Sequence, residues 1–154
     1  MKTSRAQRTF LVGVTLLAGI LTGCAGGSGG GEATSEIHIA AILPLSGALA
    51  RQGTLEFEGA KLAVEEINAA GGIESLDGAK LVLDSHDAGA SVESAVTATN
   101  QALGGDLPTA AVGAWASSLT LGATEVSERK RVPWVTVSFA DAITDRGFSH
   151  VFQM

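Results

Sequence analysis

The sequence contains a single cysteine, Cys24, and few basic residues. One cysteine excludes an internal disulfide, and the cysteine spacing of zinc-binding modules is absent as well. The 10 lysines and arginines are outnumbered by 16 aspartates and glutamates, which gives a net charge of −6. Because such a chain has no positive field to attract phosphate backbones, we expect no nucleic-acid partner.

Motifs of the common catalytic classes are also missing. The expected fold over 36–154 contains neither HExxH nor GxSxG, and the single cysteine precedes it. Asp84 and Asp87 flank His86 and would suit a metal, but the solvated end of a strand explains them better. Glycine pairs at 71–72 and 104–105 follow expected helices, whereas glycines that cradle a phosphate precede them. We therefore predict a protein that is not an enzyme and that holds no metal and no cofactor.

The beginning of the chain has the features of an export signal. Three basic residues precede an apolar run over 10–21, which is too short to span a bilayer as a helix. The run leads into LTGC, which looks like a bacterial lipobox and ends at Cys24. This order predicts a lipoprotein signal peptide over 1–23 and a lipid on the Cys24 thiol. The alternative is a structural cysteine at the end of a membrane anchor.

A glycine- and serine-rich stretch separates Cys24 from the rest of the chain. Residues 24–35 have too little apolar area to fold and predict a flexible tether. The folded part is therefore expected to cover residues 36–154, and a lipid on Cys24 would hold it at the membrane surface.

From residue 36 onward, apolar runs typical of strands alternate with stretches of helical periodicity. Strands are expected at 36–43, 80–87, 109–113, 132–137 and 151–154. This alternation predicts an α/β fold, an open parallel sheet with helices on both faces. If the strand order is 2-1-3-4-5, ligands bind where that order reverses. The loops 44–53 and 114–118 should then face each other.

The first helix is expected to begin with Thr54 as its N-cap and to end at the glycine pair 71–72. Its apolar periodicity predicts a buried face made of Leu55, Gly59, Leu62, Ala63, Ile67 and Ala70.

Three loop positions are candidates for ligand contact. Ser117 and Ser118 lie at the expected start of a helix, where unpaired backbone N–H groups favour a carboxylate. The alternative is that one of these serines is only an N-cap. Ser46 precedes a glycine that allows close approach of a ligand, or it belongs to a simple turn. Trp115 would wall a pocket or pack under its own loop.

Four stretches carry a family resemblance: IHIAAILPLSG from residue 37, QGTLEFEGAKLAVEEINAAGGI from 52, AWASS from 114 and ITDRGFSHVFQ from 143. Together they resemble the amino-terminal lobe of the leucine/isoleucine/valine-binding type of substrate-binding protein from ABC transporters, the periplasmic binding protein type I fold. The most specific part is 56–73. Members of that family have two lobes and are more than twice as long, so the resemblance implies a truncated amino-terminal lobe.

The resemblance also implies roles for individual residues. The serine that holds the ligand's α-carboxylate corresponds to Ser117, with Ala116 and Ser118 beside it. An aromatic residue that covers the ligand corresponds to Gln52, which is not aromatic. In the loop after the fourth strand, Ser138 would supply a hydroxyl, and Asp141 would either receive an amino group or cap the following turn.

The resemblance implies an extracytoplasmic lipoprotein that captures a small amino-acid-like ligand for an ABC permease. A branched-chain amino acid is the default ligand, with amides, urea and aromatic acids as alternatives. Two other classes stay open: the extracellular sensor domain of a signalling receptor, and a secreted α/β enzyme.

Overall fold

Five parallel strands form one open sheet in the order β2-β1-β3-β4-β5, in a computed structural model that describes residues 35–154. The strands are β1 (Glu36–Leu43), β2 (Lys80–Asp87), β3 (Ala110–Gly113), β4 (Trp134–Thr136) and β5 (Val151–Gln153). This is the order that the sequence analysis considered, and the predicted parallel pairing is confirmed for all neighbouring strands. The expected signal peptide, Cys24 and nearly all of the tether lie outside the described residues.

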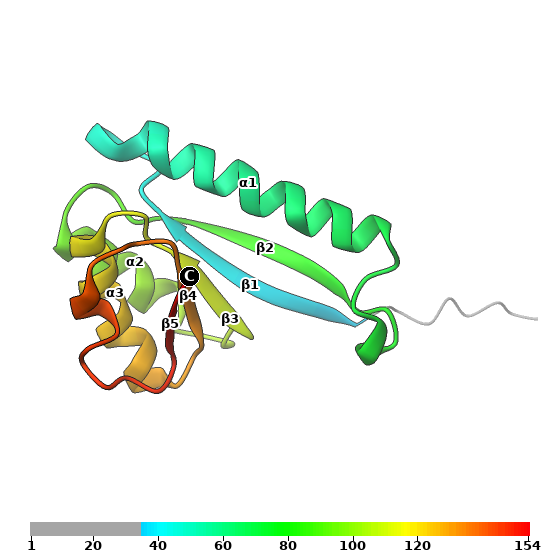
Figure 1. Cartoon of the computed structure of the whole chain (residues 1–154). Helices are drawn as coiled ribbons and strands as arrows, with labels where there is room; N and C mark the ends of the chain where they lie inside the picture. Colours follow the sequence, from blue (N-terminus) through cyan, green and yellow to red (C-terminus); the bar gives the residue numbers. More distant parts are fainter. Residues whose placement is uncertain (1–34) are drawn as a thin grey trace, which may run out of the picture. The chain divides into compact units, whose positions relative to one another are not determined.

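Three helices cover the two faces of the sheet, as predicted. They are α1 (Ala50–Ala69), α2 (Val92–Ala102) and α3 (Ser117–Lys130). Figure 1 shows α1 along one face, over β1 and β2, and α2 and α3 together on the other face. Short 3-10 turns are η1 (Gly47–Leu49), η2 (Glu74–Leu76) and η3 (Asp141–Ile143). Within residues 35–154, no helix combines the length and apolar character needed to cross a membrane.

The core is centred on the carboxyl-terminal half of β1. Residues 40–43 of β1 are almost fully buried, whereas Glu36 and His38 are exposed. Trp134 of β4 is fully buried, and its indole N–H donates to the Gly113 carbonyl at 2.8 Å. The best-packed part of the sheet therefore lies near the carboxyl ends of β1, β3 and β4, where a rigid frame can position loops.

Helix α1 begins four residues before the predicted cap. The 3-10 turn η1 runs directly into it, since the Ala50 N–H bonds to the Gly47 carbonyl and Leu49 is the N-cap. Thr54 lies inside the helix, so the prediction of Thr54 as N-cap is wrong. No residue between 49 and 53 interrupts the helical hydrogen bonds. The η1 turn provides the first hydrogen bonds of the helix, which a capping side chain would otherwise provide.

The predicted buried face of α1 is also wrong. Leu55, Leu62 and Ile67 are 62%, 57% and 36% exposed. The helix turns a different stripe toward the sheet, in which Gly53 is buried and Glu56, Phe57, Ala60, Val64 and Asn68 are half-buried.

Contacts at its two ends fix this rotation of α1. Gly53 lies directly against the Pro44 carbonyl. Near the other end, the Asn68 side chain donates to the Leu81 carbonyl and accepts from the Leu81 N–H, both at 2.8 Å. Since β2 is an edge strand, Asn68 satisfies backbone groups that no neighbouring strand pairs with.

Candidate functional site

A cavity of about 500 Å³ opens beyond the carboxyl ends of β3 and β4. Its lining residues are Trp115, Ala116, Ser117, Val137, Phe139 and Ala140. The first three were predicted from the sequence, and the structure brings them together. Val137 and Phe139 were missed, although strand periodicity could have found them: Trp134, Thr136 and Ser138 are buried, so the residues between them face outward.

The turn between β3 and α3 has an unusual backbone. Trp115 adopts a left-handed conformation with φ of 65°, which bulky residues rarely do. Its carbonyl accepts a hydrogen bond from the Ser138 hydroxyl at 2.8 Å. The Ala114 N–H, one residue earlier, donates to the Thr120 hydroxyl at 3.1 Å. Such strain persists only where surrounding contacts hold it, and these bonds come from both α3 and the loop after β4.

Three buried hydroxyl groups connect the two loops. The Ser138 Oγ lies 2.7 Å from the Thr120 Oγ1 and accepts from the Thr136 hydroxyl at 3.0 Å. The Ser138 N–H donates to the Thr136 Oγ1 at 3.1 Å. Ser138 is fully buried and does not line the cavity. The structure thus places Ser138 beneath the Trp115 turn, where it holds the cavity wall in position.

The amino terminus of α3 forms the polar end of the cavity. Ala116 is the N-cap and Ser117 the first helical residue, without a side-chain cap. The interpretation of Ser117 or Ser118 as the cap is therefore wrong, because the helix begins one residue earlier than a serine cap would require. Ser117 lines the cavity, and Ser118 is exposed beside it. The first backbone N–H groups of a 14-residue helix favour a negative charge here.

The loop after β1 is directed toward β2 instead. The Asp87 Oδ1 accepts from the backbone N–H groups of Leu45, Ser46 and Gly89 at 2.9, 3.2 and 2.8 Å. Burial acts to raise the pKa of Asp87, but these bonds and one from the Ser46 hydroxyl outweigh it and lower the pKa. Ser46 is consequently held at the end of β2 and does not line the cavity.

The loop over 44–53, which was expected to face the loop over 114–118, contributes no lining residue to this cavity. The cavity lies between the loops after β3 and β4, and Gln52 belongs to α1 rather than to a loop. The Gln52 Oε1 and the Glu56 Oε2 are buried without a hydrogen-bond partner. Burial raises the pKa of Glu56, and Glu56 is one of the residues that line a separate cavity of about 220 Å³ between α1 and the sheet.

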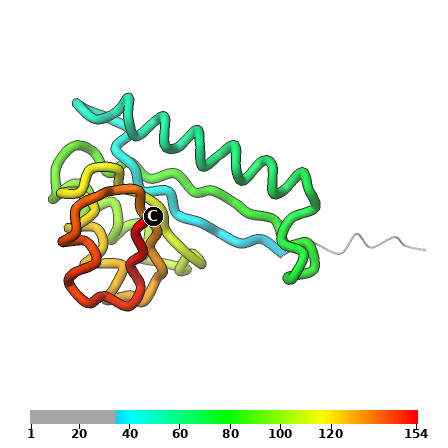
Figure 2. Tube along the Cα trace, viewed as in Figure 1, coloured from blue at the N-terminus to red at the C-terminus, as the bar shows by residue number. Residues whose placement is uncertain are grey.

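The loop after β4 extends from the cavity to α3. Asp141 is exposed, adjoins the lining residue Ala140, and starts η3 without capping that turn through its side chain. In Figure 2 the orange-to-red segment between β4 and β5 passes along α3. Glu128 of α3 accepts from the Ser149 and His150 N–H groups at 3.0 and 2.9 Å, bonds that lower its pKa.

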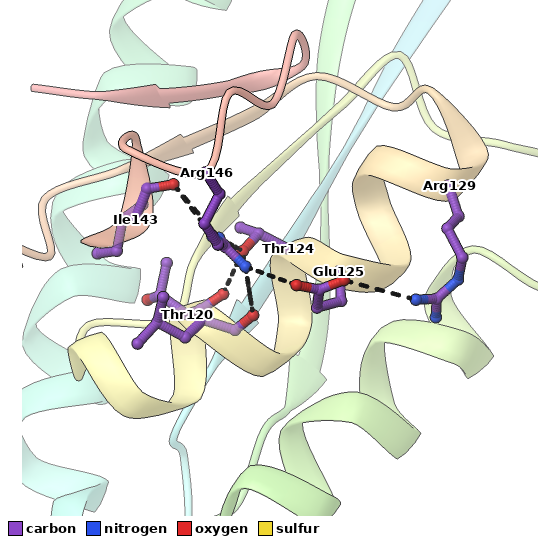
Figure 3. A network of polar contacts seen from close by, with 7 residues as sticks. Thr120, Thr124, Glu125, Arg129, Ile143 and Arg146 are labelled. Atoms are coloured by element: carbon purple, nitrogen blue, oxygen red, sulfur yellow. Dashed lines mark hydrogen bonds and ion pairs between the residues drawn. The ribbon is translucent and has the colours of Figure 1, made fainter. Parts of the chain in front are cut away.

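Arg146 is the main anchor of this segment (Figure 3). Its guanidinium donates to the Thr124 hydroxyl at 2.5 Å, to the Leu121 carbonyl at 3.0 Å and to the Ile143 carbonyl at 3.3 Å. It also pairs with Glu125 at 3.0 Å. Arg146 therefore ties η3, and with it the cavity residue Ala140, to α3.

Asp84 and Asp87, which flank His86 in β2, have different partners. The His38 Nδ1 lies 2.7 Å from the Asp84 Oδ2, while Asp87 holds the first loop. Among the residues that the structure describes, no three histidine, cysteine or acidic side chains are grouped so that they could hold a metal ion.

Comparisons with known proteins agree with this geometry. A family model described as periplasmic binding protein matches residues 36–154. The chain belongs to the periplasmic binding protein family. It is 33% identical over 127 residues to Leu/Ile/Val-binding protein homolog 7 of Brucella abortus (strain 2308), a match that covers 82% of this chain and 31% of the relative. It is 30% identical to Leu/Ile/Val-binding protein homolog 8 of the same strain, over 99% of this chain and 35% of the relative.

A solved structure of the family has the same arrangement. The branched-chain amino acid transporter substrate binding protein LivJ from Streptococcus pneumoniae, in complex with isoleucine, matches with a TM-score of 0.71 and 33% identity, covering 77% of this chain and 33% of that one. These relatives are substrate-binding proteins, not enzymes. The chain spans about a third of the length of the relatives that it matches.

Proposed function

We propose that the protein is an extracytoplasmic solute-binding lipoprotein that captures a small amino-acid-like ligand for an ABC transporter. The observation that carries the proposal is the cavity that opens on Ser117 and the amino terminus of α3 and is otherwise apolar. Membership of the periplasmic binding protein family supports it. The names of the relatives make a branched-chain amino acid the first candidate ligand.

In this proposal the ligand's carboxylate binds the Ser117 hydroxyl and the first N–H groups of α3, where the helix dipole favours negative charge. The ligand's apolar side chain packs on Trp115, Val137 and Phe139. Asp141, exposed next to Ala140, would accept the ligand's ammonium group. Ser46 and Gln52 lie outside the cavity and have no part in the proposal.

Full affinity would require a second lobe. The lining residues Val137 and Phe139 are exposed to solvent, whereas sites for small molecules bury most of the ligand's surface. Since the chain spans about a third of its relatives' length, the enclosing contacts and the ABC permease partner belong to the proposal for the whole protein.

Ser117→Ala should weaken ligand binding by about ten- to a hundredfold. A hydrogen bond to a charged group contributes roughly 1.5 to 3 kcal/mol, and Ser117 is the hydroxyl in the cavity lining. Because Ser117 does not cap α3, thermal stability should change little. Titration calorimetry of the full-length protein with leucine, isoleucine and valine would measure the effect.

Ser118→Ala is the matched control, since Ser118 is exposed and outside the lining. It should leave affinity unchanged. Equal affinities of the wild type and Ser117→Ala would show that the Ser117 hydroxyl does not bind the carboxylate.

Attachment to the membrane is proposed from the leader alone. The LTGC sequence behind a basic and apolar leader supports cleavage before Cys24 and lipidation of its thiol. Cys24→Ser should move the protein out of the membrane fraction and abolish incorporation of a labelled fatty acid. Retained labelling would contradict the proposal, because the chain has no other thiol.

A further inference from the structure

The cavity between the loops after β3 and β4 is lined by two aromatic residues. Of the six lining residues, Trp115 and Phe139 are aromatic, Val137 is aliphatic, and none is charged. Phe139 is 86% exposed and Val137 is 46% exposed. Exposure of these apolar side chains to water is unfavourable. They border the amino terminus of α3, which forms the polar end of the cavity. The cavity therefore offers an apolar surface and a carboxylate-binding end side by side.

The two aromatic residues are held by the same hydrogen-bond network. Ser138 immediately precedes Phe139, and its hydroxyl donates to the Trp115 carbonyl at 2.8 Å. Ser138 itself is fixed by the buried hydroxyls of Thr120 and Thr136. The backbone positions that carry the two rings are therefore set before a ligand arrives, which reduces the ordering that binding requires.

We propose that this cavity selects a carboxylate ligand that carries an aromatic ring, packed between Trp115 and Phe139 with its carboxylate at Ser117. The inference rests on the proposed function and specifies its ligand. Contacts between aromatic rings add to the effect of buried area alone, by an amount equal to roughly two- to tenfold in affinity. A volume of about 500 Å³ lies within the range of pockets for small ligands.

The test is titration calorimetry of the full-length protein with L-phenylalanine, 3-phenylpropionate and L-leucine. L-phenylalanine is expected to bind about tenfold more tightly than L-leucine. The probe 3-phenylpropionate has the same ring and carboxylate without the ammonium group. If it binds as tightly as L-phenylalanine, the natural ligand is an aromatic acid. If it binds more weakly, and Asp141→Asn weakens the binding of L-phenylalanine but not that of 3-phenylpropionate, the natural ligand is an aromatic amino acid. Both results support the inference.

Variants test the roles of the two rings. Phe139→Leu and Trp115→Leu should each reduce the preference for L-phenylalanine over L-leucine several-fold. Phe139 is exposed, so its variant should fold even if Trp115→Leu does not. Phe152→Leu is the control, because Phe152 is a half-exposed phenylalanine of β5 outside the cavity. Equal or tighter binding of L-leucine by the wild type would overturn the inference and leave the proposed function intact. Binding of none of the three probes would overturn both.

Discussion

Replacing Gly53 by alanine is expected to lower the free energy of unfolding by roughly 3 kcal/mol, although alanine is the better helix former. A Cβ atom at Gly53 would lie 2.1 Å from the Pro44 carbonyl oxygen and 2.7 Å from its carbonyl carbon. Both are backbone atoms at the end of β1, so α1 would have to move away from the sheet. Chemical denaturation followed by circular dichroism would measure the change.

Gly59→Ala provides a control within the same helix. A Cβ atom at Gly59 has no heavy atom within 4 Å. Alanine should therefore raise the unfolding free energy by roughly 0.5 to 1 kcal/mol, through helix propensity and a less flexible unfolded chain. Two stabilised variants would mean that α1 does not lie against Pro44.

Arg146→Ala should cost roughly 3 kcal/mol of stability. The Arg146 side chain is only 21% exposed, and its removal leaves the Thr124 hydroxyl and the carbonyls of Leu121 and Ile143 without their charged donor. The guanidinium also lies 4.2 Å from the centre of the Phe148 ring, a contact that would be lost. Ligand affinity should fall as well, because η3 would no longer be tied to α3.

Arg129→Ala separates this effect from loss of the ion pair. Arg129 approaches the same Glu125 carboxylate at 3.9 Å, but its side chain is 64% exposed. Exposed pairs contribute less than about 1 kcal/mol, so this variant should retain nearly all its stability. Figure 3 shows the two arginines on either side of Glu125. Equal losses in both variants would assign the stabilisation to Glu125 rather than to the buried bonds of Arg146.

The candidate site could be predicted only in part. Trp115, Ala116 and Ser117 were found because they lie where a strand passes into a helix, at the carboxyl edge of a parallel sheet. Ser138 was chosen for its hydroxyl, yet the alternation that begins in β4 turns it inward and turns Phe139 outward. The hydroxyl group made Ser138 the candidate in that loop, but the direction of the backbone decides which residue lines the cavity.

Sequence patterns alone were enough to predict the fold class and the order of its elements. Nearly continuous apolar runs require strands covered on both sides, and the helices between them require parallel crossovers, which leaves few topologies. These are local patterns repeated along the chain, so they can be recognised without knowing which residues are in contact in the folded protein.

The rotation of α1 and the position of the cavity depend on contacts in the folded protein. Both stripes of α1 contain apolar residues, so periodicity could not choose between them. The choice was made by contacts between residues far apart in sequence, Asn68 with the free edge of β2 and Gly53 with Pro44. In the same way, Asp87 directs the loop after β1 toward β2 and Ser138 joins the turns after β3 and β4. Such bonds depend on where the strands end in space, which no local pattern in the sequence specifies.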